Sequence, residues 1–262
     1  MRNFDFLNIL TLALLFSVAY LTAHYFVQRR ATTGVSGDPD WLTANIRSLF
    51  PVLLIVILVR CFIFQPYRVP TGSLEPTVMP GDLIFVTQYN YGLNLPLLDK
   101  KWWPVATPQR GQIALFRWPV NPTITFVKRV IGVPGDHISY HHKVLSINGV
   151  VMQQKDMGSF HEVGGPGGDV HRYLEHLGGV QHYILRNKDV PATDFTDLVV
   201  PAHHYFMMGD NRDDSDDSRD WGFVAESAFV GRAQWVWFNI NFSPFDIDWH
   251  RIGHSLTASK VS

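Results

Sequence analysis

The chain contains very little cysteine and has no excess of charge of either sign. Its 262 residues include a single cysteine, Cys61, which lies in an apolar run. This excludes a disulfide framework within the chain and a cysteine-based zinc site. The 22 Lys and Arg residues are balanced by 23 Asp and Glu residues, so the formal net charge is −1. Because no basic stripe is present to neutralise phosphates, nucleic acid is not an expected partner.

The sequence also lacks the Gly-x-Ser-x-Gly elbow that presents the serine in many Ser-His-Asp hydrolases. A serine becomes a nucleophile only when a neighbouring base accepts its proton, and a buried lysine can be that base as well as histidine can. A hydrolase of this sequence would therefore have to depend on another serine-containing motif.

Long apolar runs occur only in the first quarter of the chain. Residues 7–26 are apolar apart from a few polar side chains, and residues 48–64 form a second run that is interrupted by Arg60. About 20 apolar residues suffice to cross a bilayer, and an arginine near the end of a span can extend to the headgroups. We therefore expect two transmembrane helices in residues 1–64, joined by a loop at about 28–47.

The polar loop between the two runs carries Arg29, Arg30 and Arg47 against two aspartates. Arginines that flank a loop favour a cytoplasmic placement, so everything after residue 64 would lie outside the cytosol. Two alternatives stay open: a cleaved signal peptide for the first run, and a buried helix of a soluble domain for the second. The first run lacks a convincing small-x-small cleavage site, and the aliphatic content of the second favours a span.

From residue 65 onward the composition predicts a mainly β fold. Runs of Val, Ile, Phe, Tyr and Trp alternate with clusters of Gly, Pro, Asn and Asp, about every ten residues. The clearest strands are expected at residues 82–87, 112–117, 124–131, 143–147 and 235–240. Asn148-Gly149 predicts a tight hairpin after the fourth of them. Residues 137 to about 200 show weaker periodicity, and we interpret them as a variable insertion in one extracytoplasmic domain of residues 65–262.

The segment that follows the second apolar run is a hydroxyl-rich turn. Residues 69–77 read Val-Pro-Thr-Gly-Ser-Leu-Glu-Pro-Thr. Pro-Thr-Gly-Ser is ordinary turn chemistry, so a purely structural turn is one interpretation. However, the preceding span would hold Ser73 near the membrane surface, and Thr71 supplies a second hydroxyl that is suited to help the Ser73 backbone N–H stabilise an oxyanion. Ser73 is therefore a candidate nucleophile.

Lys128 lies in an apolar strand that ends at a Pro-Gly turn, Phe-Val-Lys-Arg-Val-Ile-Gly-Val-Pro-Gly-Asp at residues 126–136. With a pKa of about 10.4 a free lysine is protonated and useless as a base at neutral pH. The alternation of a strand places Lys128 on one face with Phe126 and Val130, where desolvation would disfavour the ammonium. The alternative is an ordinary lysine at a solvated sheet edge.

A third segment, residues 207–222, is an acidic run that also contains arginines. A calcium loop is the obvious rival interpretation, but the EF-hand template needs Gly at its sixth position and Glu at its twelfth. Counted from Asp213, those positions hold Ser218 and Val224. The arginines indicate local ion pairs that hold a loop rigid. We expect neither a metal ion nor another cofactor, with ion binding as the open alternative.

In this order, the three segments resemble those of bacterial type I signal peptidases, the membrane-bound serine endopeptidases that remove signal peptides from exported preproteins. The resemblance extends from the second apolar run almost to the carboxyl end. It implies a Ser-Lys dyad with Ser73 as the nucleophile and Lys128 as the general base. It also implies that the Thr71 hydroxyl and the Ser73 amide form the oxyanion hole.

The same resemblance implies supporting residues and a substrate preference. Ser215 would orient the lysine, and Asp217 and Arg219 would form an ion pair beside it. Cleavage would follow small-x-small motifs, with shallow apolar pockets for the small side chains. The positional candidates for these pockets are Tyr67, Val69, Leu74, Val78, Phe126 and Val127. For each of them, a role as plain core remains open.

The resemblance further implies a multi-pass protein of the bacterial inner membrane with its catalytic domain on the periplasmic side. Its partners would be preproteins and the lipid bilayer, which aromatic and basic side chains would contact. Candidates for that contact are Lys100, Lys101, Trp102, Trp103, Trp235, Trp237, Phe242, Phe245 and Trp249, although a core role is favoured for the strand at 235–240. Two other functions stay open: a self-cleaving Ser-Lys protease of the repressor type, and a non-enzymatic anchored domain that binds exported chains.

Overall fold

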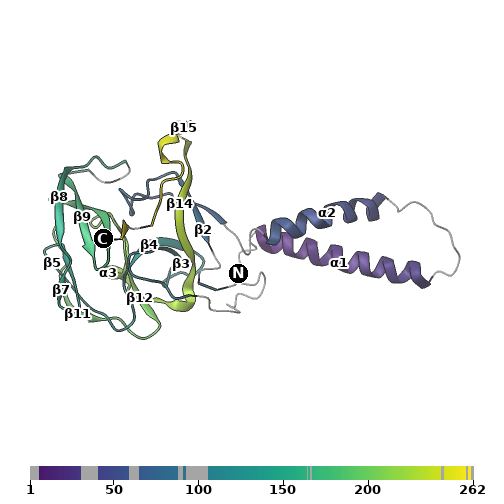
Figure 1. Ribbon diagram of the computed structural model, residues 1–262, viewed down its shortest axis with the longest axis horizontal. Helices are drawn as coiled ribbons and strands as arrows, with labels where there is room; N and C mark the ends of the chain where they lie inside the picture. Colours follow the sequence, from purple (N-terminus) through teal and green to yellow (C-terminus); the bar gives the residue numbers. More distant parts are fainter. Residues whose placement is uncertain are drawn as a thin grey trace.

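The computed structural model describes residues 6–30, 41–58, 65–87, 91–92, 106–163, 165, 167–242, 245–257 and 259–260. It consists of a helical hairpin and a β-rich body (Figure 1). The expectation of a mainly β fold with two amino-terminal apolar helices is confirmed.

The helical hairpin is made of α1 (Phe6–Arg30) and α2 (Trp41–Leu58). Both helices are long and apolar enough to cross a membrane. They contact each other, and the Tyr20 hydroxyl lies 3.2 Å from Oγ1 of Thr43. Helix α2 begins at Trp41, so the last part of the loop expected at 28–47 is helical. The apolar content of this stretch is too low to mark it as part of a span, but Thr43 is fully buried. Residues 59–64 of the expected second span lie outside the described residues.

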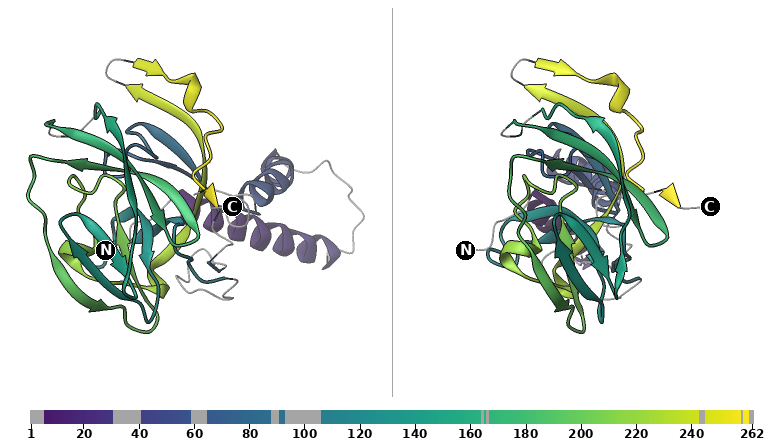
Figure 2. Two further views of the ribbon diagram at one scale, coloured as in Figure 1. Left: turned by 60° about the vertical axis from the view of Figure 1, so that its left-hand side comes forward. Right: turned by 90° about the vertical axis from the view of Figure 1, so that its left-hand side faces the viewer.

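The main sheet of the body has eight strands in the order β1-β2-β14-β3-β4-β12-β13, with β15 paired to β14. All of its pairings are antiparallel. The bounds are Gln65–Arg68 (β1), Asp82–Thr87 (β2), Ile113–Arg117 (β3), Thr125–Gly132 (β4), His204–Met208 (β12), Val224–Ala225 (β13), Phe229–Phe242 (β14) and Phe245–Ile247 (β15). The strands expected here are present, and the one expected at 235–240 is part of the longer β14, which extends with β15 beyond the rest of the sheet (Figure 2).

Two further four-stranded sheets are formed by the expected insertion, together with β16 from the carboxyl end. One has the order β11-β5-β6-β7, with bounds Phe195–Val199 (β11), His137–His141 (β5), Val144–Ile147 (β6) and Val150–Val151 (β7). The other has the order β16-β10-β9-β8, with bounds Ser259–Lys260 (β16), Val180–Asn187 (β10), Val170–Leu177 (β9) and Gln154–Ser159 (β8). The region is thus regular β structure. Its alternation is weak in sequence because strands such as β8 are mostly exposed on both faces.

The hairpin expected at Asn148-Gly149 is confirmed. Both residues have positive φ angles, 51° and 78°, which a two-residue type I′ turn requires and which Asn-Gly tolerates. The turn joins β6 to β7. The remaining elements are short: α3 (Ser218–Trp221), η2 (Glu226–Ala228) and η3 (Trp249–Arg251).

Candidate active site

The turn that carries Ser73 connects β1 to β2 and is fixed by its own backbone and by the core. The Glu75 amide donates to the Gly72 carbonyl at 2.9 Å, and the Val78 amide donates to the Leu74 carbonyl at 2.9 Å. Leu74 and Val78 are fully buried in the apolar cluster beneath the turn. Because these side chains hold the turn from below, Ser73 stays at a defined, partly exposed position.

The hydroxyl groups of Thr71 and Ser73 lie close together on this turn. Thr71 Oγ1 is 3.4 Å from Ser73 Oγ. Thr71 is exposed, so its hydroxyl is accessible to a substrate at the same surface as Ser73. The structure thus places the Thr71 hydroxyl, which was predicted to form the oxyanion hole with the Ser73 amide, beside the Ser73 hydroxyl.

Lys128 lies in the middle of β4, opposite Ala114 of β3. Its side chain is on the face predicted from the alternation, with Nζ 5.8 Å from the centre of the Phe126 ring. Only 4% of the residue is exposed. Burial disfavours the ammonium and lowers the pKa of Lys128 to about 8, although the nearby carboxylates of Asp217 and Asp216 act in the opposite direction. A lysine in this setting is partly neutral near neutral pH.

The acidic loop, residues 209–220, brings a hydroxyl to the amine of this lysine. Lys128 Nζ donates to Ser215 Oγ at 2.9 Å, and Ser215 Oγ donates to Asp217 Oδ2 at 2.8 Å. Arg219 donates to Asp217 from Nε and Nη2, both at 2.8 Å. Burial alone would raise the pKa of Asp217, but its hydrogen bonds and ion pair with Arg219 outweigh burial and lower the pKa. Asp217 is therefore a carboxylate that fixes Ser215.

Gly209 joins the Ser73 turn to the acidic loop. Its amide donates to Asp217 Oδ2 at 3.0 Å, and the Asn211 amide donates to the Ser73 carbonyl at 3.1 Å. A Cβ atom at position 209 would lie 2.4 Å from the Ser73 carbonyl oxygen and 2.3 Å from Ser215 Oγ. The backbone of the loop thus approaches the turn as closely as only glycine allows.

Among the described residues, no hydrogen bond joins the Ser73 hydroxyl to the Lys128 amine. Within the described residues, the Lys128 amine bonds to Ser215, and the Ser73 hydroxyl is paired with Thr71. Hydrogen bonds between reacting groups are often long or unformed until a substrate is bound. The structure nevertheless brings all the predicted reacting and supporting side chains to one place, around Gly209.

A buried ion pair links the Ser73 turn, β4 and the acidic loop. The sequence analysis did not identify it. Arg129 donates to Asp210 from Nε at 2.7 Å and from Nη2 at 2.6 Å, and both side chains are 1% exposed. The Thr77 hydroxyl donates to the same carboxylate at 2.5 Å. Arg129 follows Lys128 in the same apolar strand and therefore lies on its opposite face, which was the available signal that its guanidinium needs a buried partner. The pair fixes β4, the Ser73 turn and the acidic loop to one another.

Five of the six candidate pocket residues lie in one apolar cluster. They are Tyr67, Val69, Leu74, Val78 and Val127. Leu74 and Val78 are 0% exposed, so in this state they form the base of the cluster rather than its surface. Phe126 lies apart from them, in the cluster that includes Phe116 and Trp221.

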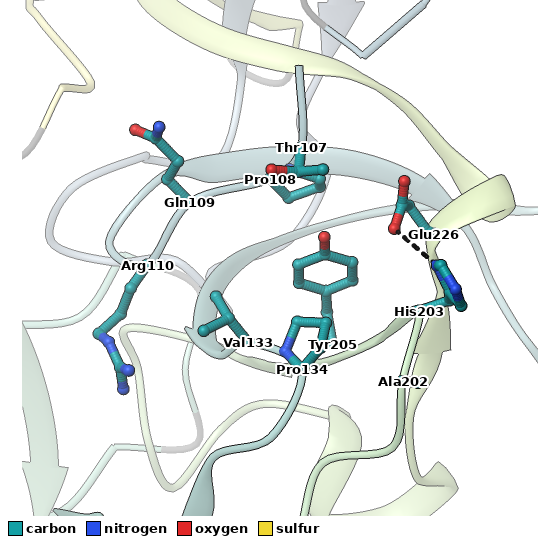
Figure 3. A pocket seen from close by; sticks show the side chains of 10 residues that line it. All are labelled: Thr107, Pro108, Gln109, Arg110, Val133, Pro134, Ala202, His203, Tyr205 and Glu226. Atoms are coloured by element: carbon teal, nitrogen blue, oxygen red, sulfur yellow. Dashed lines mark ion pairs between the residues drawn. The ribbon is translucent and has the colours of Figure 1, made fainter. Parts of the chain in front are cut away.

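A separate hollow of about 590 Å³ contains neither Ser73 nor Lys128 (Figure 3). Tyr205 lies between Pro108 and Pro134 in it, and His203 pairs with Glu226 at 3.5 Å on one side. Among the described residues, no group of three or more His, Cys, Asp and Glu side chains is arranged to hold a metal ion. The residues predicted for chemistry and this hollow therefore belong to different parts of the molecule.

The chain is similar to known proteins over most of its length. A family model described as "Signal peptidase, peptidase S26" matches residues 42–238. A signal peptidase I of Pseudomonas aeruginosa is 37% identical over 268 residues, which cover 90% of this chain and 92% of the relative. A signal peptidase I of Pseudomonas fluorescens is 37% identical over 265 residues, with the same coverage of both chains. A crystal structure of a signal peptidase I from Enterococcus faecalis matches with 29% identity and a TM-score of 0.31, over 48% of this chain and 95% of that chain.

Proposed function

Since this chain belongs to the signal peptidase family, peptidase S26, it is a membrane-anchored protease that removes signal peptides from preproteins, and we propose that Ser73 and Lys128 form its catalytic dyad. The observation that carries this assignment is the buried Lys128 amine, which Ser215 holds beside the Ser73 turn. We further propose that residues 65–262 are the catalytic domain, with residues 137 to about 200 as an insertion.

The reaction is acyl transfer. Neutral Lys128 accepts the Ser73 proton while Ser73 Oγ attacks the carbonyl carbon of the scissile peptide bond. With a pKa of about 8, roughly one amine in ten is neutral at pH 7. The protonated amine then gives its proton to the leaving nitrogen, which departs as the amino terminus of the mature protein. A water molecule hydrolyses the ester, and its proton passes through Lys128 back to Ser73.

The negative oxygen of the tetrahedral intermediate needs hydrogen-bond donors that are already in place. The Ser73 amide and the Thr71 hydroxyl are the proposed donors. Thr71 is suited to this role because its hydroxyl lies 3.4 Å from the attacking oxygen and is exposed. It can exchange its contact with Ser73 for one with the substrate as the charge develops.

Selectivity for small side chains near the cleavage site follows from the apolar cluster beside the Ser73 turn. Val69 and Val127, 3% and 8% exposed, border this cluster, and the fully buried Leu74 and Val78 close it from below. Because these buried side chains fill the space beneath the turn, a substrate side chain could enter only a shallow depression there. We propose these residues, together with Tyr67 and Phe126, as the pocket walls for a small-x-small motif.

Incubation of the detergent-solubilised full chain with a purified preprotein tests this function. We expect one cut, immediately after a small-x-small motif, and a mature product with a new amino terminus at that point. Amino-terminal sequencing of the product locates the cut, and the preprotein with a bulky residue at the cleavage position serves as the control. Self-cleavage without cleavage of the preprotein would instead indicate a protease of the repressor type.

We propose that the protein spans the bacterial inner membrane twice, with the catalytic domain on the periplasmic side. The arginines near the loop between the two helices support this orientation.

We also propose that the catalytic domain itself contacts lipid. Trp235 and Trp237 were favoured as core residues, but they are 39% and 43% exposed, and Trp249 is 67% exposed. Exposed tryptophans favour the membrane interface. The Lys-Lys-Trp-Trp stretch at 100–103 and the side chains of Phe242 and Phe245 lie outside the described residues.

A truncated protein that starts at Gln65 should therefore still bind vesicles of anionic phospholipid. Replacing both Trp235 and Trp249 by serine should weaken that binding, because both side chains are exposed, whereas replacing Val150, an exposed apolar residue of β7, should not. Co-sedimentation with vesicles measures the effect. A truncated protein that stays in the supernatant and is fully active without detergent or lipid would contradict the lipid contact.

A further inference from the structure

The acidic loop that holds Lys128 is bonded on its other side to the sheet formed by β8, β9 and β10. The Leu185 amide of β10 donates to the Asp210 carbonyl at 2.9 Å, and the Arg212 amide donates to the Leu185 carbonyl at 3.0 Å. Leu185 and Asn211 form a parallel bridge. Within the described residues, strand β16 pairs with β10 at Val180 and Gln181 alone. The acidic loop thus continues the edge of β10 beyond the point where β16 ends.

Side chains strengthen this attachment at Arg212. Nη1 of Arg212 donates to Glu175 of β9 at 2.9 Å, and Nη2 donates to the other carboxylate oxygen. Both side chains are 0% exposed. His182 of β10 lies near two carboxylates, with Nε2 3.3 Å from Glu175 of β9 and 3.8 Å from Asp210 of the acidic loop. The loop is therefore fixed to this sheet by charge as well as by its backbone.

A second buried lysine, Lys143, binds the acidic loop two residues before Ser215. Lys143 lies in the turn between β5 and β6, and 7% of it is exposed. Its Nζ donates to Asp213 Oδ2 at 2.8 Å and to the Asn187 carbonyl at 2.6 Å. The Asn187 amide donates to the same Asp213 oxygen at 2.7 Å. One carboxylate oxygen of the acidic loop is thus held by two donors, one from each of the two smaller sheets.

The distance along the chain from Asp213 to Ser215, the residue whose hydroxyl holds the Lys128 amine, is short. Only Asp214 separates Asp213 from Ser215, and two residues span at most about 7 Å. The charge of Asp213 is buried, with 7% of its side chain exposed. Without Lys143 it would lack its cationic partner, and a buried unpaired charge moves toward water if the chain permits it. Any such movement displaces Ser215 from the amine of Lys128.

We propose that Lys143 is a positioning residue for the peptidase reaction, which acts through Asp213 and Ser215 to hold the Lys128 amine in place. The two smaller sheets are then part of the catalytic apparatus, because they supply Lys143 and Asn187. This inference rests on the Ser73–Lys128 dyad. Lys143 is bonded to Asp213 and to the Asn187 carbonyl, and its effect is on the position and the hydration of the general base.

The test is Lys143→Met in the detergent-solubilised full chain, with cleavage of a preprotein measured from pH 6 to pH 10. We expect kcat to fall by about tenfold to a hundredfold, since a displacement of an ångström at a reacting group has effects of that size. KM should change little. The midpoint of the pH profile should rise, because water that reaches Lys128 stabilises its ammonium.

Lys188→Met is the matched control. Lys188 lies just after β10, and its ion pair with Asp169 is long and exposed, at 3.8 Å with side chains 46% and 52% exposed. It should keep the kcat and the pH midpoint of the original protein. If Lys143→Met acted only through general stability, it would lower the melting temperature without moving the pH midpoint.

A double variant separates positioning from folding. Lys143→Met with Asp213→Asn leaves no buried unpaired charge, and the asparagine can still accept from the Asn187 amide, so kcat should recover above that of Lys143→Met alone. If Lys143→Met does not fold, Asp213→Ala alone decides: it removes the oxygen that Lys143 and the Asn187 amide hold, and it should lower kcat and raise the midpoint. An unchanged kcat and midpoint in the folded single variants would overturn the proposal. Cleavage by a Ser73→Ala protein would instead overturn the dyad on which it rests.

Discussion

Replacement of either Ser73 or Lys128 by alanine is expected to abolish cleavage of a preprotein, with kcat at least about a thousandfold lower. Ser73→Ala removes the attacking oxygen. Lys128→Ala removes the only amine at the site described here, and Ser215 is then left without its donor. Because the two groups work as a unit, the double variant should be no worse than either single variant.

Folding should survive both changes. Ser73 is partly exposed, and Lys128→Ala removes a buried amine whose burial is itself unfavourable. Circular dichroism and thermal unfolding check this point. Ser159→Ala and Lys188→Ala, at exposed positions, serve as controls of the same residue types. Ser73→Cys should keep a trace of activity at most. Turnover at the original rate by a folded Lys128→Ala protein would exclude the proposed mechanism.

The rate of cleavage should rise with pH through a single ionisation at about pH 8. Lys128 acts as a base only when it is neutral, and burial lowers its pKa to about 8. The rate is therefore highest above this value and falls as the amine becomes protonated. At pH 6 kcat/KM should be lower by about a hundredfold, which corresponds to two pH units below the pKa.

The pH midpoint should depend on the apolar residues around the amine. Phe126, whose ring centre is 5.8 Å from Nζ, and Val130, which is fully buried, keep water away from Lys128. Replacing either of them by serine should move the midpoint upward, since hydration stabilises the ammonium. Val150→Ser, at an exposed position in β7, should leave it unchanged. A profile that rises only near the ordinary lysine value of about 10.4 would show that Lys128 is not desolvated in the working enzyme.

The sequence was sufficient to propose the reacting groups because each of them stands in a short motif that resembles the family. The two-residue period of a strand also placed Lys128 on one face with Phe126 and Val130, and Lys128 is buried in the structure. The Asn148-Gly149 turn has a similarly direct relation between residue type and backbone angle. The supporting roles of Ser215, Asp217 and Arg219 followed from a motif in which all three residues are close in sequence.

The parts that could not be predicted depend on contacts between distant segments. Nothing near Glu175, His182 or Lys143 in the sequence indicates that these side chains face the acidic loop. The exposure of Trp235 and Trp237 has a related cause. The pairing of β14 with β2 shifts register twice, between Ala233 and Trp235 and between Val236 and Phe238. Such bulges change which residues face the core, and a simple alternation cannot locate them.

The hydrogen bond between Ser215 and Asp217 determines the direction in which Lys128 can accept a proton. Asp217 is ionised and can only accept, so the one hydroxyl proton of Ser215 is committed to it. Ser215 must then offer its oxygen to Lys128, which donates an N–H there. A neutral amine has two N–H bonds and one lone pair. With one N–H fixed on Ser215, rotation about the last carbon–nitrogen bond leaves only two orientations for the lone pair. Because Ser215 can only accept from Lys128, the lone pair of the neutral amine is not used in that hydrogen bond. The lone pair therefore stays free to accept the proton of the nucleophile.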